Sequence, residues 1–202
     1  METSERALNS TISELYKLQG ALNRAIERER SKKWQLSLWS KFVRFRDGGC
    51  CVNCGSTQRV QAHHIVRKVL YPHGALETGN GISLCWPCHK QIHAEFNRRP
   101  NLSLPLGAEQ GDDQEEWSYL FGLLKDDAQK RGLPEDDFYY LNDQMIIFFV
   151  RVQGHEQLLE LVVEGSMSRI RFAHEVWSIM PESFYSNFAS ELVRLNLPTI
   201  GR

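Results

Sequence analysis

Cysteine and histidine residues are concentrated in one short stretch of the chain, in a pattern suited to binding metal ions. Two Cys-x-x-Cys pairs, Cys51/Cys54 and Cys85/Cys88, are separated by 30 residues. Four thiolates at this spacing are typical of a structural zinc site with tetrahedral geometry. Gly55 follows the first pair and permits the tight turn that brings both sulfurs toward one ion. The sequence therefore predicts a structural Zn²⁺ held by these four cysteines.

A fifth cysteine leaves one alternative for this site. Cys50 directly precedes the first pair and could take the place of Cys51. We favour Cys51 because it gives both pairs the same spacing. In small zinc modules the metal contributes an apparent free energy of about 10–16 kcal/mol, enough to fold a segment too short to bury a large core.

Histidines form a second possible metal site. His89 and His93 lie four residues apart in a segment with helical periodicity, so both imidazoles face one side. His63 and His64 are neighbours in an expected strand, where successive side chains point to opposite faces, so we expect different roles for them. We expect His63, His89 and His93 to hold one divalent cation, with positions left open for phosphate oxygens and water.

The remaining imidazole of this group, that of His64, is then free to accept a proton from water. An unperturbed histidine pKa of about 6.5 suits a general base near neutral pH. Asn80 is placed to hold this base in one orientation through its side-chain amide. The sequence therefore predicts His64 and Asn80 as catalytic residues.

Taken together, these residues resemble the signature of the HNH endonuclease family, in its zinc-finger-containing branch. The resemblance covers about residues 42–97 and rests on these motifs: Cys51-Val52-Asn53-Cys54-Gly55, Ala62-His63-His64-Ile65, Gly79-Asn80-Gly81, Leu84-Cys85-Trp86-Pro87-Cys88-His89 and His93. By position, His64 resembles the family's general base and His63 the metal ligand that precedes it. Asn80 resembles the middle Asn and His89 the final His, while His93 resembles an additional helix ligand of colicin-type nucleases.

The resemblance implies a ββα-metal fold, in which a β-hairpin carries the base and a helix carries metal ligands. It also implies metal-dependent hydrolysis of DNA phosphodiester bonds, leaving 5′-phosphate and 3′-hydroxyl ends. Many relatives have Asp at the His63 position or Asn at the His89 position. A set of three histidines leaves the catalytic cation open among Mg²⁺, Mn²⁺, Ni²⁺ and Zn²⁺.

Charge is divided unequally along the chain, which indicates where DNA would bind. Residues 1–100 contain 16 Lys and Arg against 8 Asp and Glu, whereas residues 101–202 contain 8 against 17. The first half therefore favours a polyanion, which we expect to be double-stranded DNA. The candidates for phosphate contacts are basic residues near the metal ligands: Arg44, Arg46, Arg67, Lys68, Lys90, Arg98 and Arg99.

Hydrophobic periodicity and linker composition predict an α+β protein in several parts. We expect an N-terminal helical region at 1–46, the zinc-stapled ββα-metal nuclease domain at 47–98, and an acidic linker at 99–116. A separate, mixed or mostly helical region follows at 117–202. Within it, 145–152 and 158–163 are consistent with a strand pair or with buried helices. We expect this acidic region to mediate homodimer formation or to bind a protein partner.

Two functional classes fit these patterns. The first is a DNA endonuclease of restriction, phage-defence or mobile-element type. We expect it in the cytoplasm, since no apolar run reaches the roughly 18 residues that span a membrane. Secreted toxins of the family usually carry the nuclease at the C-terminal end, whereas here it lies on the N-terminal side. This position disfavours a toxin. The second class is a non-catalytic zinc module that binds nucleic acid or protein. That class explains the four cysteines but leaves the histidines and Asn80 without a role.

Overall fold

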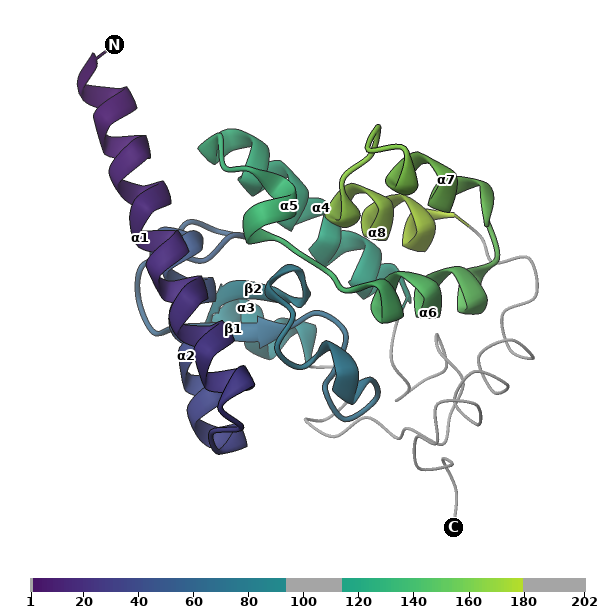
Figure 1. The fold of residues 1–202 in the computed structure, drawn as a ribbon, viewed down its shortest axis with the longest axis horizontal. Coiled ribbons are helices and arrows are strands. Elements are labelled where there is room, and N and C mark those ends of the chain that lie inside the picture. Colours follow the sequence, from purple (N-terminus) through teal and green to yellow (C-terminus); the bar gives the residue numbers. More distant parts are fainter. Residues whose placement is uncertain (1, 94–113, 180–202) are drawn as a thin grey trace.

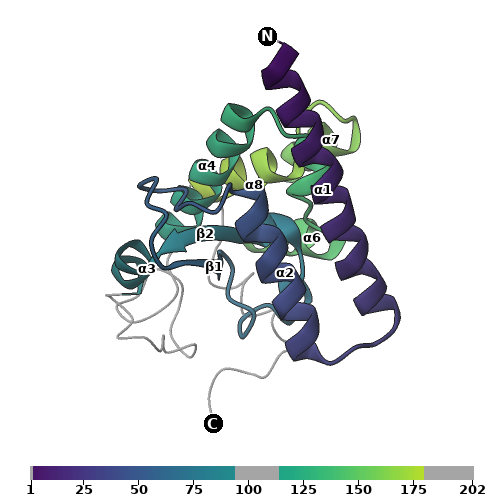
Figure 2. The ribbon, with the colours of Figure 1, turned by 90° about the vertical axis from the view of Figure 1, so that its left-hand side faces the viewer.

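Helices surround one short β-hairpin in this protein (Figures 1 and 2). The computed structural model describes residues 2–93 and 114–179. Its first two elements are helices α1 (Glu2–Glu27) and α2 (Lys32–Arg46). The N-terminal region is thus helical, as predicted.

Local sequence explains both helices. Leu15, Leu18 and Leu22 recur every three or four residues along α1 and are buried, as expected for one apolar face of a helix. At the start of α2, the Ser31 hydroxyl accepts a hydrogen bond from the backbone N–H of Trp34. This cap satisfies one of the N–H groups that a helix start leaves without a partner.

The hairpin and the helix after it have the predicted ββα order. Strand β1 (Val60–His64) pairs antiparallel with β2 (Gly81–Cys85), and His64 lies opposite Gly81. Helix α3 (Trp86–Ile92) follows β2 without a loop. The strand containing the two histidines is therefore confirmed, and the second strand has the same length of five residues.

Both predicted boundaries in this module extend too far. Alternating β-branched residues from Val60 to Val66 predict a longer strand, but β1 ends at His64, and the backbone N–H of Ile65 donates to the Asn80 carbonyl just before β2. The helical pattern from Trp86 to Asn97 predicts a longer helix than α3, which ends at Ile92 with His93 as its cap. The last four residues of that prediction, 94–97, lie outside the described residues.

The C-terminal region is helical throughout its described residues. Its elements are α4 (Gln114–Arg131), α5 (Glu135–Phe138), α6 (Asp143–Gln153), α7 (Gln157–Val163) and α8 (Arg169–Ser178). The two apolar runs that fitted either strands or helices are therefore helices, α6 and α7. Because α4 begins at Gln114, the last residues of the expected linker belong to a helix.

One hydrophobic core runs through the N-terminal helices, the hairpin and the C-terminal helices. In Figure 1, α1 and α2 lie on one side of the hairpin and α4 to α8 on the other. Tyr71, in the loop between the strands, stacks on Phe148 of α6 with ring centroids 4.4 Å apart. The apolar faces of the C-terminal helices are therefore buried against the hairpin loop as well as against each other.

None of the described helices combines the length and apolar character needed to cross a membrane.

Candidate metal and catalytic site

The four predicted zinc ligands lie together at one end of the hairpin. Cys51 and Cys54 occupy the turn after α2, Cys85 ends β2, and Cys88 lies in the first turn of α3. All four sulfurs lie within 4.8 Å of one another. Gly55 has a φ of 75°, in the left-handed region that the turn requires.

Cys50 is not part of this cluster. Its sulfur donates to the Asp47 carbonyl at 3.1 Å and accepts a hydrogen bond from Arg131 at 3.4 Å. The choice of Cys51 over Cys50, made on spacing alone, agrees with this geometry.

The chemistry of the cluster fits a bound dication. Burial, followed by the neighbouring thiols of Cys85, Cys54 and Cys51, raises the pKa of Cys88 to about 12. Four thiolates this close repel one another unless a cation neutralises them. Tetrahedral Zn²⁺ supplies that charge and suits four sulfurs.

The three predicted histidine ligands also converge, on one face of the hairpin. The imidazole of His63 on β1 lies 4.9 Å from that of His89 and 5.0 Å from that of His93, between ring centroids. Their ligating nitrogens lie within 4.8 Å of one another. His63 Nε2 is buried and has no hydrogen-bond partner among the described residues, which fits a nitrogen that ligates a metal ion.

Electrostatics keep these imidazoles neutral, the form in which they bind metals. Burial, reinforced by His89 and His93, lowers the pKa of His63 well below 6.5. Burial also lowers the pKa of His89, and together with nearby Arg67 it lowers the pKa of His93 to about 4. Protonation of the cluster therefore needs acid conditions even before a metal competes with protons.

His64 faces a different neighbour from His63. Its imidazole stacks on the indole of Trp39 from α2, with ring centroids 4.0 Å apart and planes 8° from parallel. Its Nε2 lies 2.9 Å from the Ala75 carbonyl oxygen. A carbonyl can only accept, so Nε2 carries the proton and Nδ1 keeps the lone pair that a general base needs.

Burial lowers the pKa of His64 to about 4, although its hydrogen bond to Ala75 opposes the shift. The side chain is therefore neutral, and able to accept a proton, across the neutral pH range.

Asn80 is close to the base but does not bind it. Its side-chain oxygen accepts from the Val66 N–H at 2.8 Å, and its amide nitrogen donates to the carbonyls of Val66 and Gly74. The prediction of direct amide contact with His64 is therefore wrong, since these backbone groups occupy the amide. Asn80 instead fixes the loop whose Ala75 carbonyl binds His64.

The basic candidates for DNA contact occupy different environments. Arg44, Lys68 and Lys90 are exposed. Arg67 is half-buried at the edge of the histidine cluster, with its guanidinium 3.3 Å from His93 Nδ1. Arg98 and Arg99 lie outside the described residues.

Arg46 must be removed from this set. It is 1% exposed and pairs with Asp47 at 2.8 Å. Its guanidinium also donates to the carbonyls of Thr78, Gly81 and Phe138. A side chain enclosed in this way cannot reach a phosphate.

Sequence patterns indicated only that Trp39 is an apolar residue of a helix, although it contacts the candidate base. The sequence offers one weak signal: Gly81, at the start of β2, places no side chain opposite His64. Only the pairing of the strands and the position of α2 bring these three residues together.

Residues 51–95 match the family model described as HNH endonuclease. No curated protein and no solved structure matches the chain. Residues 51–95 are therefore similar to an HNH endonuclease domain, and the four-cysteine cluster fits a zinc-binding variant of it. HNH domains are found in nucleases that act on DNA, which indicates a nuclease-like function at the level of the family.

Proposed function

We propose that this protein is a metal-dependent DNA endonuclease that hydrolyses phosphodiester bonds. The observation that carries the proposal is the convergence of three neutral imidazoles, from His63, His89 and His93, while His64 remains outside the group. A purely structural zinc module needs the four cysteines but has no use for this second arrangement.

The roles of the side chains follow from their geometry. When bound, a divalent cation (Mg²⁺, Mn²⁺, Ni²⁺ or Zn²⁺) supplies a Lewis acid that stabilises negative charge on the phosphate. His64 accepts the proton of the attacking water at Nδ1, and its Nε2–H remains bound to Ala75. Arg67, Lys68 and Lys90 provide positive charge for the DNA backbone.

We assign the activity to restriction, phage defence or mobile-element function on double-stranded DNA in the cytoplasm. The net positive charge of residues 1–100, which contain the HNH domain, supports a polyanionic substrate.

Cleavage of supercoiled plasmid tests the proposal directly. We expect nicking with at least one of magnesium, manganese, nickel and zinc, and a loss of about 10²- to 10⁴-fold in rate for His64→Ala, the usual contribution of a general base. His73→Ala is the matched control because His73 is exposed and on the loop between the strands. Nicking that survives His64→Ala would exclude the mechanism. No nicking with any of the metals would favour the non-catalytic zinc module.

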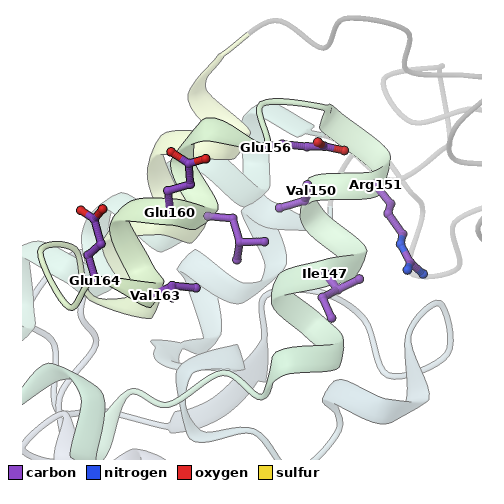
Figure 3. Close-up of a pocket in the computed structure, with 8 residues that line it drawn as sticks. Ile147, Val150, Arg151, Glu156, Glu160, Val163 and Glu164 are labelled. Carbon is purple, nitrogen blue, oxygen red and sulfur yellow. The ribbon is translucent and has the colours of Figure 1, made fainter.

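A second proposal concerns an apolar groove between α6 and α7 (Figure 3). Helix α7 has no fully buried residue, and Val163 on it is 79% exposed. Figure 3 shows Glu160 on α7, with Glu156 and Glu164 at its two ends, beside this apolar surface. We propose that the groove binds a protein segment in which Lys or Arg flank apolar residues at helical spacing. A symmetrical contact between two copies of α7 would bring like charges together, so a different protein fits better.

A synthetic amphipathic helix of leucine and lysine provides the probe for this groove. We expect binding by fluorescence anisotropy that is lost in Leu159→Asp/Val163→Asp and weakened when the three glutamates become glutamine. A scrambled peptide of equal charge separates groove binding from charge attraction. Equal binding of both peptides would contradict the proposal. Self-association in sedimentation that Val163→Asp abolishes would instead identify a second copy as the partner.

A further inference from the structure

We propose that Trp39 is a positioning residue for the candidate general base, which makes helix α2 part of the active site. The inference rests on the proposed function. The indole of Trp39 is 2% exposed and covers one face of the His64 imidazole, nearly parallel at 4.0 Å. Trp39 lies outside residues 51–95, which match the HNH family model.

Gly81 makes room for this contact. It lies opposite His64 in the hairpin register. A Cβ at Gly81 would lie 2.6 Å from Trp39 Cζ2 and 2.6 Å from Val43 Cγ2, closer than atoms in contact can approach. The φ of Gly81 is −123°, an ordinary strand value, so the position needs glycine for space and not for backbone freedom. The indole therefore lies across the strand pair at the base.

Two hydrogen bonds hold the stacked rings to the same loop. Trp39 Nε1–H donates to the Glu77 carbonyl at 2.9 Å, and His64 Nε2–H donates to the Ala75 carbonyl at 2.9 Å. The Asn80 amide fixes this loop through Val66 and Gly74. Trp39 thus sets the plane of the imidazole, while Ala75 sets its rotation within that plane.

Arg46 fixes the helix that carries Trp39. Its guanidinium donates to the carbonyl of Gly81 at 2.6 Å and to that of Thr78 at 2.6 Å. Helix α2 is therefore tied to β2, which pairs with the strand that carries the base, and to the loop that binds the base. Positioning of this kind matters because a displacement of about 1 Å in a reacting group can cost 10²-fold in rate.

Trp39→Leu removes the flat ring but keeps an apolar side chain. We expect kcat for plasmid nicking to fall about 10- to 100-fold, with KM changed less than about twofold, because phosphate contacts are unaffected. Trp39→Phe restores a flat ring and should recover most of kcat. Trp117→Leu is the matched control, since Trp117 is equally buried but packs against Trp177 in the C-terminal helices.

A second readout needs neither activity nor the catalytic cation. Long-range ¹H–¹⁵N spectra of the zinc-loaded protein should show one His64 tautomer, with the proton on Nε2, in wild type and Trp39→Phe. Trp39→Leu should show averaged ¹⁵N shifts for His64. If Trp39→Leu does not fold, Trp39→Met takes its place.

The outcomes separate this inference from the proposed function. Unchanged His64 ¹⁵N shifts in Trp39→Leu, or a loss of kcat no larger than that of Trp117→Leu, would overturn the positioning role. Nicking that is insensitive to His64→Ala would overturn the proposed function, while the His64 spectra would still decide whether Trp39 fixes the ring.

Discussion

At the scale of single residues, the buried guanidinium of Arg46 connects three parts of the chain. Arg46 and Asp47 are both completely buried as side chains, and the Asp47 carboxylate also accepts from the Ser83 N–H on β2. Arg46 reaches Phe138 of α5 as well as Thr78 and Gly81 of the hairpin loop and strand. Removing one partner of such a pair leaves an uncompensated buried charge.

Arg46→Leu should lower the free energy of unfolding by about 3–5 kcal/mol, the usual cost of breaking a buried pair. Arg44→Leu, two residues earlier on the exposed side of α2, should change it by less than about 0.5 kcal/mol. Urea denaturation followed by tryptophan fluorescence compares the two. Similar losses in both variants would contradict a structural role for Arg46.

The stability of the fold depends on pH through Glu77. Burial raises its pKa to about 7, although hydrogen bonds with Asn142 oppose the shift. Between the ordinary carboxyl value of 4.5 and this folded value, the folded state holds a proton that the unfolded state has lost. The contribution of Glu77 to the free energy of unfolding is therefore fully present below pH 4.5, and it is lost as the pH rises toward about 7.

Glu77→Gln should remove this dependence. We expect the free energy of unfolding of the variant, relative to wild type, to increase as the pH is raised from about 5 to about 7.5. Histidine titration affects both proteins equally and cancels in the difference. Glu27→Gln, at an exposed site, is the control and should show a constant difference. Parallel curves for Glu77→Gln would mean that Glu77 titrates normally.

At the scale of elements, the hairpin and α3 serve both metal sites. Cys85 ends β2 and Cys88 lies in the first turn of α3, while His89 and His93 follow along the same helix and its cap. A helix of seven residues is too short to be stable alone, so anchoring its first turn through zinc also fixes the histidines.

Cys85→Ser should therefore abolish stoichiometric zinc binding and lower stability by at least about 3 kcal/mol, or about 6–12 °C in Tm for a chain of this size. Cys50→Ser should keep both zinc and Tm, because Cys50 lies outside the cluster. Metal analysis of the purified proteins and thermal unfolding measure the two quantities. Zinc loss in Cys50→Ser but not in Cys85→Ser would reverse the assignment.

At the scale of the whole molecule, the C-terminal helices are part of the support for the hairpin loop. The Gly79 N–H donates to the Tyr140 carbonyl at 2.8 Å, and Asn142 donates to the Glu77 carboxylate at 2.7 Å. Loss of these helices would expose the apolar side chains that pack on Tyr71 and its neighbours. The segment that matches the HNH family model is therefore stabilised by residues on both sides of it.

Gly79→Ala tests the contact between the hairpin loop and the C-terminal region. The added Cβ would lie 2.3 Å from the Tyr139 carbonyl oxygen, so the backbone must shift at a cost of about 1–3 kcal/mol. Gly20→Ala on α1 is the matched control: its Cβ meets only the flexible end of Arg24, and alanine favours a helix by up to about 1 kcal/mol. Thermal unfolding should show a lower Tm for the first variant and an equal or higher Tm for the second. Equal stability of Gly79→Ala and wild type would mean that this contact is not tightly packed.

Sequence alone grouped the candidate metal ligands because their chemistry limits the choices. Thiolates in two matched Cys-x-x-Cys pairs and imidazoles at strand and helix spacing have few other uses, so residues far apart could be grouped before any contact was known. The ββα order followed from local periodicity. The runs at 145–152 and 158–163 could not be assigned, because short apolar segments fit a buried strand as well as a buried helix.

What only the tertiary structure decided was the environment of each side chain. Arg46 and Arg44 are alike in sequence, yet one is enclosed by carbonyls and the other faces solvent. Trp39 and His64 meet because Gly81 leaves space between them, which no local pattern records. The sequence determined which residues can bind metal, since ligand chemistry belongs to the residue type. Packing determined which residues orient the base, since that depends on distances between segments remote in the chain.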